Sequence, residues 1–300
     1  MSAPLRLRCP AKINLGLEVA GTRPDGFHEI RTIFQSIDLA DELWVEEAPE
    51  GGLEVEVEGA ELPPGRGNLV YRAAEALRKR AGIRRGARLK LRKRVPIGAG
   101  LGGGSSDAAV ALMGLDRLWD LGLGIAGLSA LAGELGSDVP FFLHGGTCLG
   151  LGRGEKLFPV EAKTASAADF LVACPAASLS TAQVYADWDA TLTTPAGKSR
   201  LSRFLASALT GQEEWSELAN DLEGPAIRRV QAVATLKTVL EACGARAALM
   251  SGSGPSVFGV FFDPQKVEEA ARRLGAEGYR VHRCQALSRA KYRDYIGLFD

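Results

Sequence analysis

The chain has 300 residues, of which 46% are hydrophobic and 24% are charged, a composition typical of a globular protein and not of a disordered or collagen-like chain. Its 36 Lys and Arg residues are balanced by 36 Asp and Glu residues, so no global positive field would hold a polyanion such as DNA. The length suits two domains of roughly 100–200 residues each.

Three segments of the first half alternate apolar and charged residues with the period of a half-buried strand: 5–8, 53–58 and 89–92. We expect them to form an antiparallel-type sheet with one solvent-exposed face. Apolar stripes and end signals also predict three helices, namely one over 68–83 capped by Asn68, one from Ser105 to Gly122, and one that ends at Gly136.

The segment from Arg78 to Arg94 carries ten Lys and Arg residues and no acidic residue, a pattern that is also found in nucleic-acid-binding proteins. Its basic residues alternate with apolar ones, and it lacks the interleaved aromatic residues on which nucleic-acid bases stack. The preceding segment from Asp41 to Glu61 carries nine acidic residues. We therefore favour a solvated face whose charges pair across strands, and we predict no nucleic-acid partner.

A change of composition over 160–168 predicts the boundary between a first domain, 1–162, and a second domain, 163–300. The second domain is expected to alternate strands and helices, with a surface loop around 191–200. Its predicted elements are strands at 170–174, 247–250 and 257–262 and helices at 225–243 and 264–274. Both halves indicate an α/β (α+β) fold.

Five widely spaced cysteines include no C-x-x-C pair, which argues against a disulfide framework or a zinc cage. The N-terminus has no apolar run long enough for a signal peptide, and no apolar stretch is long enough to cross a membrane. We therefore expect a cytoplasmic protein with no membrane partner.

The strongest functional signal is VPIGAGLGGGSSDAA, residues 95–109, where five glycines and two serines lead from a predicted strand into a predicted helix. Glycines let the backbone adopt positive φ and expose its N–H groups, and a helix N-terminus adds partial positive charge. This combination predicts a cradle for a polyphosphate. A flexible glycine-rich linker is the weaker interpretation, because such linkers do not join a strand to an alanine-rich helix.

Other phosphate-binding loops fit this segment less well. The P-loop pattern is absent, since Gly197-Lys198-Ser199 imitates only its end. Gly98, Gly100 and Gly103 do satisfy G-x-G-x-x-G, so a dinucleotide-binding oxidoreductase is an alternative. However, the acidic residue expected at the end of a second parallel strand is missing. The catalytic motifs of protein kinases are also missing.

The segment P-x-G-x-G-L-G-G-G-S-S-D-A-A resembles the phosphate loop of the GHMP kinases, a superfamily that includes galactokinase, homoserine kinase and mevalonate kinase. PAKINLGLEV at 10–19 is similar to the N-terminal motif of that superfamily, and ALMSGSGPSVFGVF at 248–262 is similar to its C-terminal glycine-rich motif. The resemblance implies a two-domain GHMP kinase fold, with ATP bound in an active-site cleft between the domains.

Further segments at 23–43, 136–146 and 220–223 resemble the branch of this superfamily that phosphorylates a tertiary hydroxyl of a cytidylyl methylerythritol in the non-mevalonate route to isoprenoids. The resemblance implies that this small molecule is the substrate, and we infer no obligate protein partner. Another small-molecule kinase of the superfamily is one alternative, and an RNA-binding module built on the basic strand is another.

The resemblance implies two catalytic residues, Lys12 and Asp138. Asp138 would accept or orient the proton of the attacking hydroxyl, and Lys12 beside it would favour the ionised carboxylate. Without the resemblance, Asp138 would be interpreted as a helix N-cap or turn residue and Lys12 as a strand lysine with a solvated head.

The resemblance also assigns residues to the two ligands. For ATP these are Asn68, near the adenine, and the phosphate loop with Pro96, Ile97, Gly98, Ala99, Gly100, Leu101, Gly102, Gly103, Gly104, Ser105 and Ser106. For the cytidylyl substrate they are Asn14, Phe27, His28, Thr181 and Tyr185. The family commonly has Tyr where Phe27 stands, so a hydroxyl contact is lost while the ring face is kept. Core packing is the alternative for the two aromatic residues, and an exposed turn is the alternative for His28.

Mg²⁺ is expected together with ATP, since this ion keeps waters and is held by phosphate oxygens and few protein ligands. Ser105 or Ser106 is expected near it, but no metal ligand is assigned. The second glycine loop, 251–254, is expected to buttress the active site and not to bind ATP directly.

Overall fold

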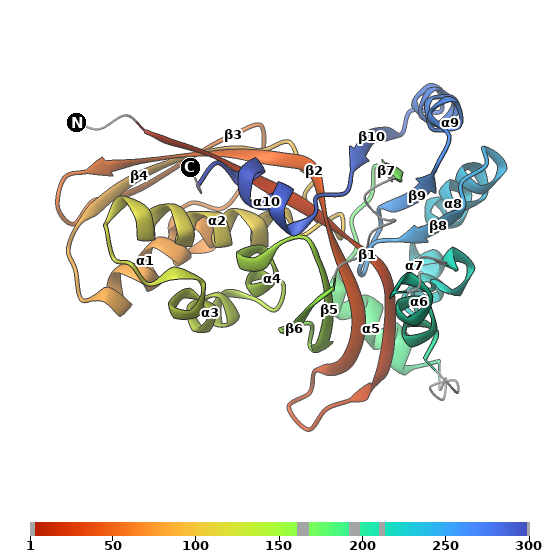
Figure 1. The fold of residues 1–300 in the computed structure, drawn as a ribbon, viewed down its shortest axis with the longest axis horizontal. Coiled ribbons are helices and arrows are strands. Elements are labelled where there is room, and N and C mark those ends of the chain that lie inside the picture. The colour runs from red at the N-terminus through yellow and green to blue at the C-terminus, as the bar shows by residue number, and fades with distance from the viewer. Residues whose placement is uncertain (1–3, 161–167, 192–198, 210–213, 299–300) are drawn as a thin grey trace.

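The computed structural model describes residues 4–160, 168–191, 199–209 and 214–298 (Figure 1). The predicted domain boundary at 162 and most of the predicted loop at 191–200 lie outside the described residues. The strands are β1 (Leu5–Thr22), β2 (His28–Ala48), β3 (Leu53–Glu58), β4 (Gly86–Arg92), β5 (Thr147–Gly152), β6 (Lys156–Val160), β7 (Asp169–Cys174), β8 (Ala247–Met250), β9 (Val257–Phe261) and β10 (Arg280–Gln285). The helices are α1 (Leu69–Ala81), α2 (Gly103–Leu118), α3 (Gly124–Leu135), α4 (Val139–His144), α5 (Thr181–Asp189), α6 (Arg200–Leu209), α7 (Glu223–Arg229), α8 (Ala232–Ala242), α9 (Pro264–Ala276) and α10 (Arg289–Ile296).

A long antiparallel hairpin of β1 and β2 forms the backbone of the first half. The other edge of β2 pairs first with β5 and then with β4, both antiparallel. Helices α1 to α4 lie on one face of this six-stranded sheet (Figure 1). The alanine-rich α2 is buried along most of its length, because small side chains let it approach the sheet and its neighbouring helices closely.

The first sheet was expected to be antiparallel, but one of its strand pairs is parallel. Strands β3 and β4 are parallel, and α1 is the crossover that this connection requires. The parallel register places the basic residues of β4 beside the acidic residues of β3, so that Arg88 is 2.8 Å from Glu54 and Arg92 is 3.1 Å from Glu58. The interpretation of the basic segment as a paired, solvated face is therefore confirmed.

The helix expected from Ser105 to Gly122 runs instead from Gly103 to Leu118. It ends early because Asp120 and Gly122 adopt positive φ, which a continuing right-handed helix cannot contain. The helix expected to end at Gly136 does end at Leu135.

The second half is built on an antiparallel sheet of order β10-β7-β9-β8, against which α8 and α9 pack. The prediction of a single helix over 225–243 was wrong. The chain forms α7 and α8 there, separated at Val230, whose backbone is extended at φ −134° and ψ 90°. The predicted strands at 170–174, 247–250 and 257–262 match β7, β8 and β9 to within a residue at either end.

One cluster of buried side chains joins the two halves. Alternate residues of β1, including Ala11, Ile13 and Leu15, pack in a cluster with Phe170 and Phe258 of the second sheet. The end of the chain then returns to the first half, where α10 lies beside β1 (Figure 1) and Tyr292 is buried in the core beneath the first sheet. The cleft between the halves therefore has walls that are held together by buried packing. Within the described ranges, no helix is long and apolar enough to span a membrane.

Candidate active site

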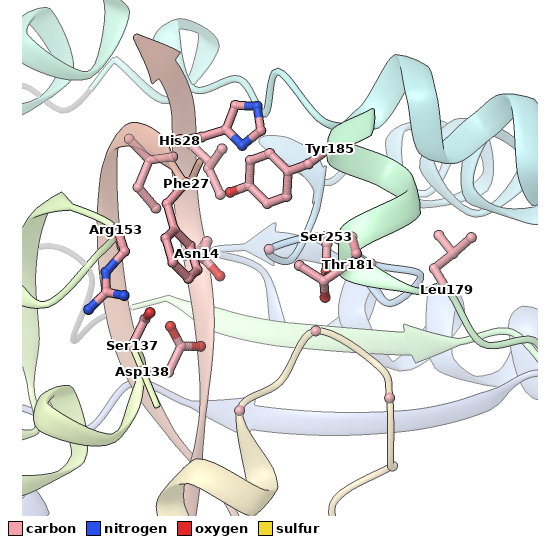
Figure 2. Close-up of a pocket in the computed structure, with 18 of the residues that line it drawn as sticks. Asn14, Phe27, His28, Ser137, Asp138, Arg153, Leu179, Thr181, Tyr185 and Ser253 are labelled. Carbon is pink, nitrogen blue, oxygen red and sulfur yellow. The ribbon is translucent and has the colours of Figure 1, made fainter. Parts of the chain in front are cut away.

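A cavity of about 700 Å³ opens where the β1–β2 hairpin, the phosphate loop, the start of α4 and the helix α5 meet (Figure 2). It brings together all of the residues predicted to act in catalysis or to bind the substrate, and three glycines of the phosphate loop. Those that line it are Lys12, Asn14, Phe27, His28, Gly98, Gly100, Gly102, Asp138, Thr181 and Tyr185.

Lys12 and Asp138 form an ion pair in this cavity, with Nζ 3.4 Å from Oδ2. The ammonium group is buried, whereas about a third of the carboxylate side chain is exposed to the cavity. Asp138 precedes α4 but makes no capping hydrogen bond through its side chain. Asp138 thus occupies the predicted N-cap position of α4 without using its side chain as a cap, and the carboxylate stays available to a ligand.

Asn14 holds Lys12 in place. The two residues lie on the same face of β1, two positions apart, and Lys12 Nζ donates a hydrogen bond of 2.6 Å to Asn14 Oδ1. Asn14 Nδ2 in turn donates to Thr32 Oγ1 at 2.7 Å. Asn14 is almost fully buried, so in this structure its amide orients the lysine.

The phosphate loop adopts the conformation expected of an anion cradle. Gly98, Gly100 and Gly102 all have positive φ, and Gly102 is followed at once by α2. The first turn of α2 leaves backbone N–H groups without helical partners. A second cavity of about 230 Å³ is lined by this loop from Pro96 to Ser105 and by Leu62 and Leu69.

A buried ionic cluster fastens both ends of this loop. Lys93 Nζ contacts Asp41 Oδ2 and lies 2.6 Å from Oδ2 of Asp107, the fifth residue of α2. The other oxygen of Asp41 accepts a hydrogen bond of 2.8 Å from the backbone N–H of Val95. Burial raises the pKa of Asp107 to about 7, with the attraction of Lys93 opposing this rise and the charge of Asp41 adding to it. Sequence analysis missed this cluster.

The second glycine loop packs against the first, as expected. Ser251 Oγ donates to the carbonyl oxygen of Gly100 at 2.9 Å, and a Cβ at Gly100 would lie 2.1 Å from the carbonyl oxygen of Ser251. Asn220 of the NDLE segment secures the second loop, because its Nδ2 donates to the carbonyl oxygens of Met250 and Gly252. Gly252, Ser253 and Gly254 also line the larger cavity.

Aromatic and polar side chains form the other end of the cavity (Figure 2). The imidazole of His28 stacks on the ring of Tyr185, with centroids 4.5 Å apart and planes at 23°. Phe27 is half-exposed, and the guanidinium carbon of Arg153 lies 4.6 Å from its ring centroid. Burial raises the pKa of the Tyr185 phenol, and the charge of Asp138 raises it further. One face of the Tyr185 ring is therefore covered by His28.

Two of the residues assigned to ATP line neither cavity. Asn68 is buried, and its Oδ1 accepts a hydrogen bond of 2.9 Å from Val70 N as the cap of α1. Ser106 is fully buried, and its hydroxyl has no partner within the described part of the chain. Their roles toward ATP stay predictions.

The cavity also contains residues that sequence analysis did not single out, among them Arg153 on the β5–β6 turn and Asp189 at the end of α5. An isolated Arg or Asp on a predicted surface carries no periodic or motif signal. Only the fold brings these side chains next to Phe27 and His28.

Comparison with known proteins agrees with this geometry. The family model "GHMP kinases N terminal domain" matches residues 68–146, and the family model "GHMP kinases C terminal" matches residues 205–280. The chain is 44% identical to the 4-diphosphocytidyl-2-C-methyl-D-erythritol kinase of Pelotomaculum thermopropionicum, over 88% of this chain and 91% of the relative. It is 41% identical to the kinase of the same name from Bacillus pumilus, over 87% of this chain and 89% of the relative.

Solved structures show the same similarity. A crystal structure of 4-(cytidine 5'-diphospho)-2C-methyl-D-erythritol kinase superposes with a TM-score of 0.78 at 37% identity, covering 94% of this chain and 98% of the other. Homoserine kinase from Cytophaga hutchinsonii superposes with a TM-score of 0.74 at 18% identity, covering 95% of each chain. The second similarity concerns the fold alone.

Proposed function

The chain belongs to the GHMP kinase family, and from this we propose that it is the ATP-dependent kinase of 4-diphosphocytidyl-2-C-methyl-D-erythritol. It transfers the γ-phosphate of ATP to the 2-hydroxyl of that substrate, giving the 2-phosphate and ADP, in non-mevalonate isoprenoid precursor biosynthesis. Relatives of this name match at about 40–44% identity over most of the chain.

The observation that carries the proposal is the position of the Lys12–Asp138 pair. It lies in a cavity that is lined by the phosphate loop on one side and by Phe27, His28 and Tyr185 on the other. A phosphoryl donor held on the loop and a cytidylyl group held among the aromatic residues would meet at this pair.

The residues then divide the chemistry among them. Exposed N–H groups of the phosphate loop and the α2 N-terminus hold the ATP phosphates and stabilise the charge that develops during transfer. Asp138 accepts or orients the proton of the attacking hydroxyl, and Lys12 stabilises the charge that develops on the hydroxyl oxygen. Asn14 keeps the ammonium group aimed at this position, which lowers the entropic cost of alignment.

The loop also fits Mg²⁺ bound together with ATP. Within the described residues no cluster of three or more His, Cys, Asp or Glu side chains could hold a metal ion, so the ion would depend chiefly on phosphate oxygens and water. Of the two candidate serines, Ser105 is partly exposed whereas Ser106 is fully buried, which favours the Ser105 hydroxyl as the protein ligand. The ion would neutralise negative charge on the ATP phosphates.

The fold argues against the alternatives. A dinucleotide-binding unit needs, after its helix, a strand that pairs in parallel with the first strand. The first strand after α2 is β5, which pairs antiparallel with β2 and β6 and does not pair with β4. The basic strand β4 pairs its charges with β3, as described above, so it offers no free surface to RNA. A cytosolic location and the lack of an obligate partner belong to the proposal and are compatible with five buried, unpaired thiols.

The test is a coupled assay of ADP release with four acceptors: the cytidylyl methylerythritol, mevalonate, homoserine and galactose. We expect turnover with the first and only background rates with the others. Comparable turnover with mevalonate or homoserine would contradict the assigned substrate and leave the family unaffected.

A further inference from the structure

His28 is held from two sides by one helix. Its ring stacks on Tyr185, and its Nε2 lies 2.8 Å from Oδ1 of Asp189. Tyr185 and Asp189 are four residues apart on α5, so both project from the same face of the helix. Asp189 also accepts a long hydrogen bond of 3.5 Å from Thr22 Oγ1. The imidazole thus comes from the hairpin of the first half and is oriented by the second half.

This contact determines which nitrogen carries the proton. A carboxylate can only accept hydrogen bonds, so the Nε2 that approaches Asp189 must be the N–H nitrogen. In a neutral imidazole the other nitrogen, Nδ1, is then an acceptor. Within the described residues Nδ1 has no hydrogen-bond partner, and His28 lines the cavity beside Phe27 and Tyr185 (Figure 2).

We propose that Asp189 is a positioning residue that sets the preference for cytosine, because it fixes His28 in the Nε2–H tautomer and so presents Nδ1 as an acceptor to the base. Cytosine carries an exocyclic amine that donates to such an acceptor. Uracil has a carbonyl oxygen at that position, which would face Nδ1 acceptor to acceptor and leave both unpaired. This inference rests on the proposed cytidylyl substrate and assigns one specificity element to the same site.

The helix supplies a matched control. Asp187 lies two residues before Asp189 and is bound to Arg229, with Oδ1 2.9 Å from Nη2. It does not line the cavity. Asp187→Asn removes a carboxylate from the same helix without touching His28, whereas Asp189→Asn offers a donor as well as an acceptor to Nε2 and so no longer fixes the Nε2–H tautomer.

The kinetic test measures kcat/KM for the cytidylyl substrate and its uridylyl analogue in the wild type, Asp189→Asn, Asp189→Ala and Asp187→Asn. We expect Asp189→Asn to reduce the cytosine-to-uracil ratio by about tenfold, the effect of one mispaired hydrogen bond, and Asp187→Asn to leave it unchanged. An unchanged ratio in Asp189→Ala, which removes the acceptor entirely, contradicts the proposal. No turnover of the cytidylyl substrate by the wild type would instead contradict the proposed function.

A second readout does not depend on activity. The chain has only three histidines, so the ring ¹⁵N signals of His28 can be assigned by comparison with His28→Ala. We expect the wild-type signals to identify protonated Nε2 and unprotonated Nδ1, and Asp189→Asn to shift the balance toward protonated Nδ1. A wild-type ring protonated at Nδ1 overturns the proposal, even if Asp189→Asn proves inactive with both bases.

Discussion

Lys12 illustrates what the sequence can and cannot predict about a single residue. Its place in PAKINL pointed to catalysis by resemblance, but its partners come from different parts of the chain: Asp138 precedes α4, and Asn14 follows on the same strand. A buried ammonium group is costly unless it is paired and hydrogen-bonded. The two partners supply that compensation, and no pattern of spacing predicts the pairing with Asp138.

The first prediction concerns this pair. Lys12→Ala and Asp138→Ala should each lower kcat by about 10²–10⁴-fold, the usual contribution of a positioned proton-transfer group, with little change in the Kd of ATP. Because the two residues act as a unit, the double variant should lose less than the product of the single losses. Steady-state kinetics and calorimetric titration of ATP measure both quantities.

Near wild-type kcat in either single variant would show that the pair takes no part in transfer. Loss of ATP binding in both variants would show that Lys12 and Asp138 bind the nucleotide and do not act on the transferred group.

The second prediction concerns the aromatic end of the cavity. Tyr185→Ala should weaken cytidylyl and uridylyl analogues alike, by about 1–3 kcal/mol, because every base has a face that stacks and because Asp189 still holds Nε2 of His28. His28→Ala should instead reduce the difference between them. The measurement is kcat/KM for both analogues. An undiminished preference for cytosine in His28→Ala would show that backbone groups, and not the His28 side chain, recognise the base.

At the scale of the element, local signals predicted helices and strands better than they predicted partners. Asn68 caps α1 and Gly82 ends it in a left-handed conformation, both as the residue types indicate. The parallel pairing of β3 with β4 and the break between α7 and α8 were missed. Alternation reveals a strand but not its neighbour's direction, and Val230 is extended in the middle of a pattern that suits a helix.

The contact between the two glycine loops gives a third prediction. Gly100→Ala should destabilise the protein by at least about 1–2 kcal/mol, because its φ of +78° strains an L-residue and its Cβ would collide with the backbone of Ser251. ATP binding should weaken as well. Gly133→Ala on α3 is the control, since its Cβ meets nothing within 4 Å and alanine favours a helix by about 0.5–1 kcal/mol.

Denaturant unfolding measures the free energies of unfolding of Gly100→Ala and Gly133→Ala. Equal midpoints for Gly100→Ala and the wild type would mean that the loops do not need this close approach.

The fourth prediction concerns the buried cluster of Asp41, Lys93 and Asp107. Burial raises the pKa of Asp107 to about 7, above the value of about 3.9 in an unfolded chain. Between these values the folded state holds a proton that the unfolded state has lost, so stability falls as the pH rises from about 4 to about 7. Cys9, Asp41 and Lys93 are the titratable groups that face Asp107.

Asp107→Asn cannot lose that proton. The free energy of unfolding of the wild type, measured relative to this variant, should therefore decline by up to about 1.4 kcal/mol per pH unit across the window. Denaturant titrations of both proteins at pH 5 and pH 8 measure the change. If the free energy of unfolding of the wild type, relative to Asp107→Asn, instead increased with pH, the pKa of Asp107 would be lowered by folding and not raised.

At the scale of the whole molecule, the cleft depends on contacts that join the ends of the chain to its middle. The described residues form two sheets, while the division into domains at 162 stays a prediction. Composition gave no sign that Leu287 and Tyr292 would pack into the core of the first half. Motifs identify the residues of the phosphate loop and the proposed substrate site, but the fold alone shows that one cavity joins them and adds Arg153 and Asp189.

The central claim is that this cavity directs phosphoryl transfer to a tertiary hydroxyl of the cytidylyl substrate. The most direct test is the proton-coupled ³¹P NMR spectrum of the product formed from ATP and 4-diphosphocytidyl-2-C-methyl-D-erythritol. The 2-carbon carries a methyl group and no hydrogen, so the account predicts one new phosphomonoester singlet that appears in step with ADP. A new signal split by hydrogens on its ester carbon, or ADP formed with free phosphate alone, would contradict it.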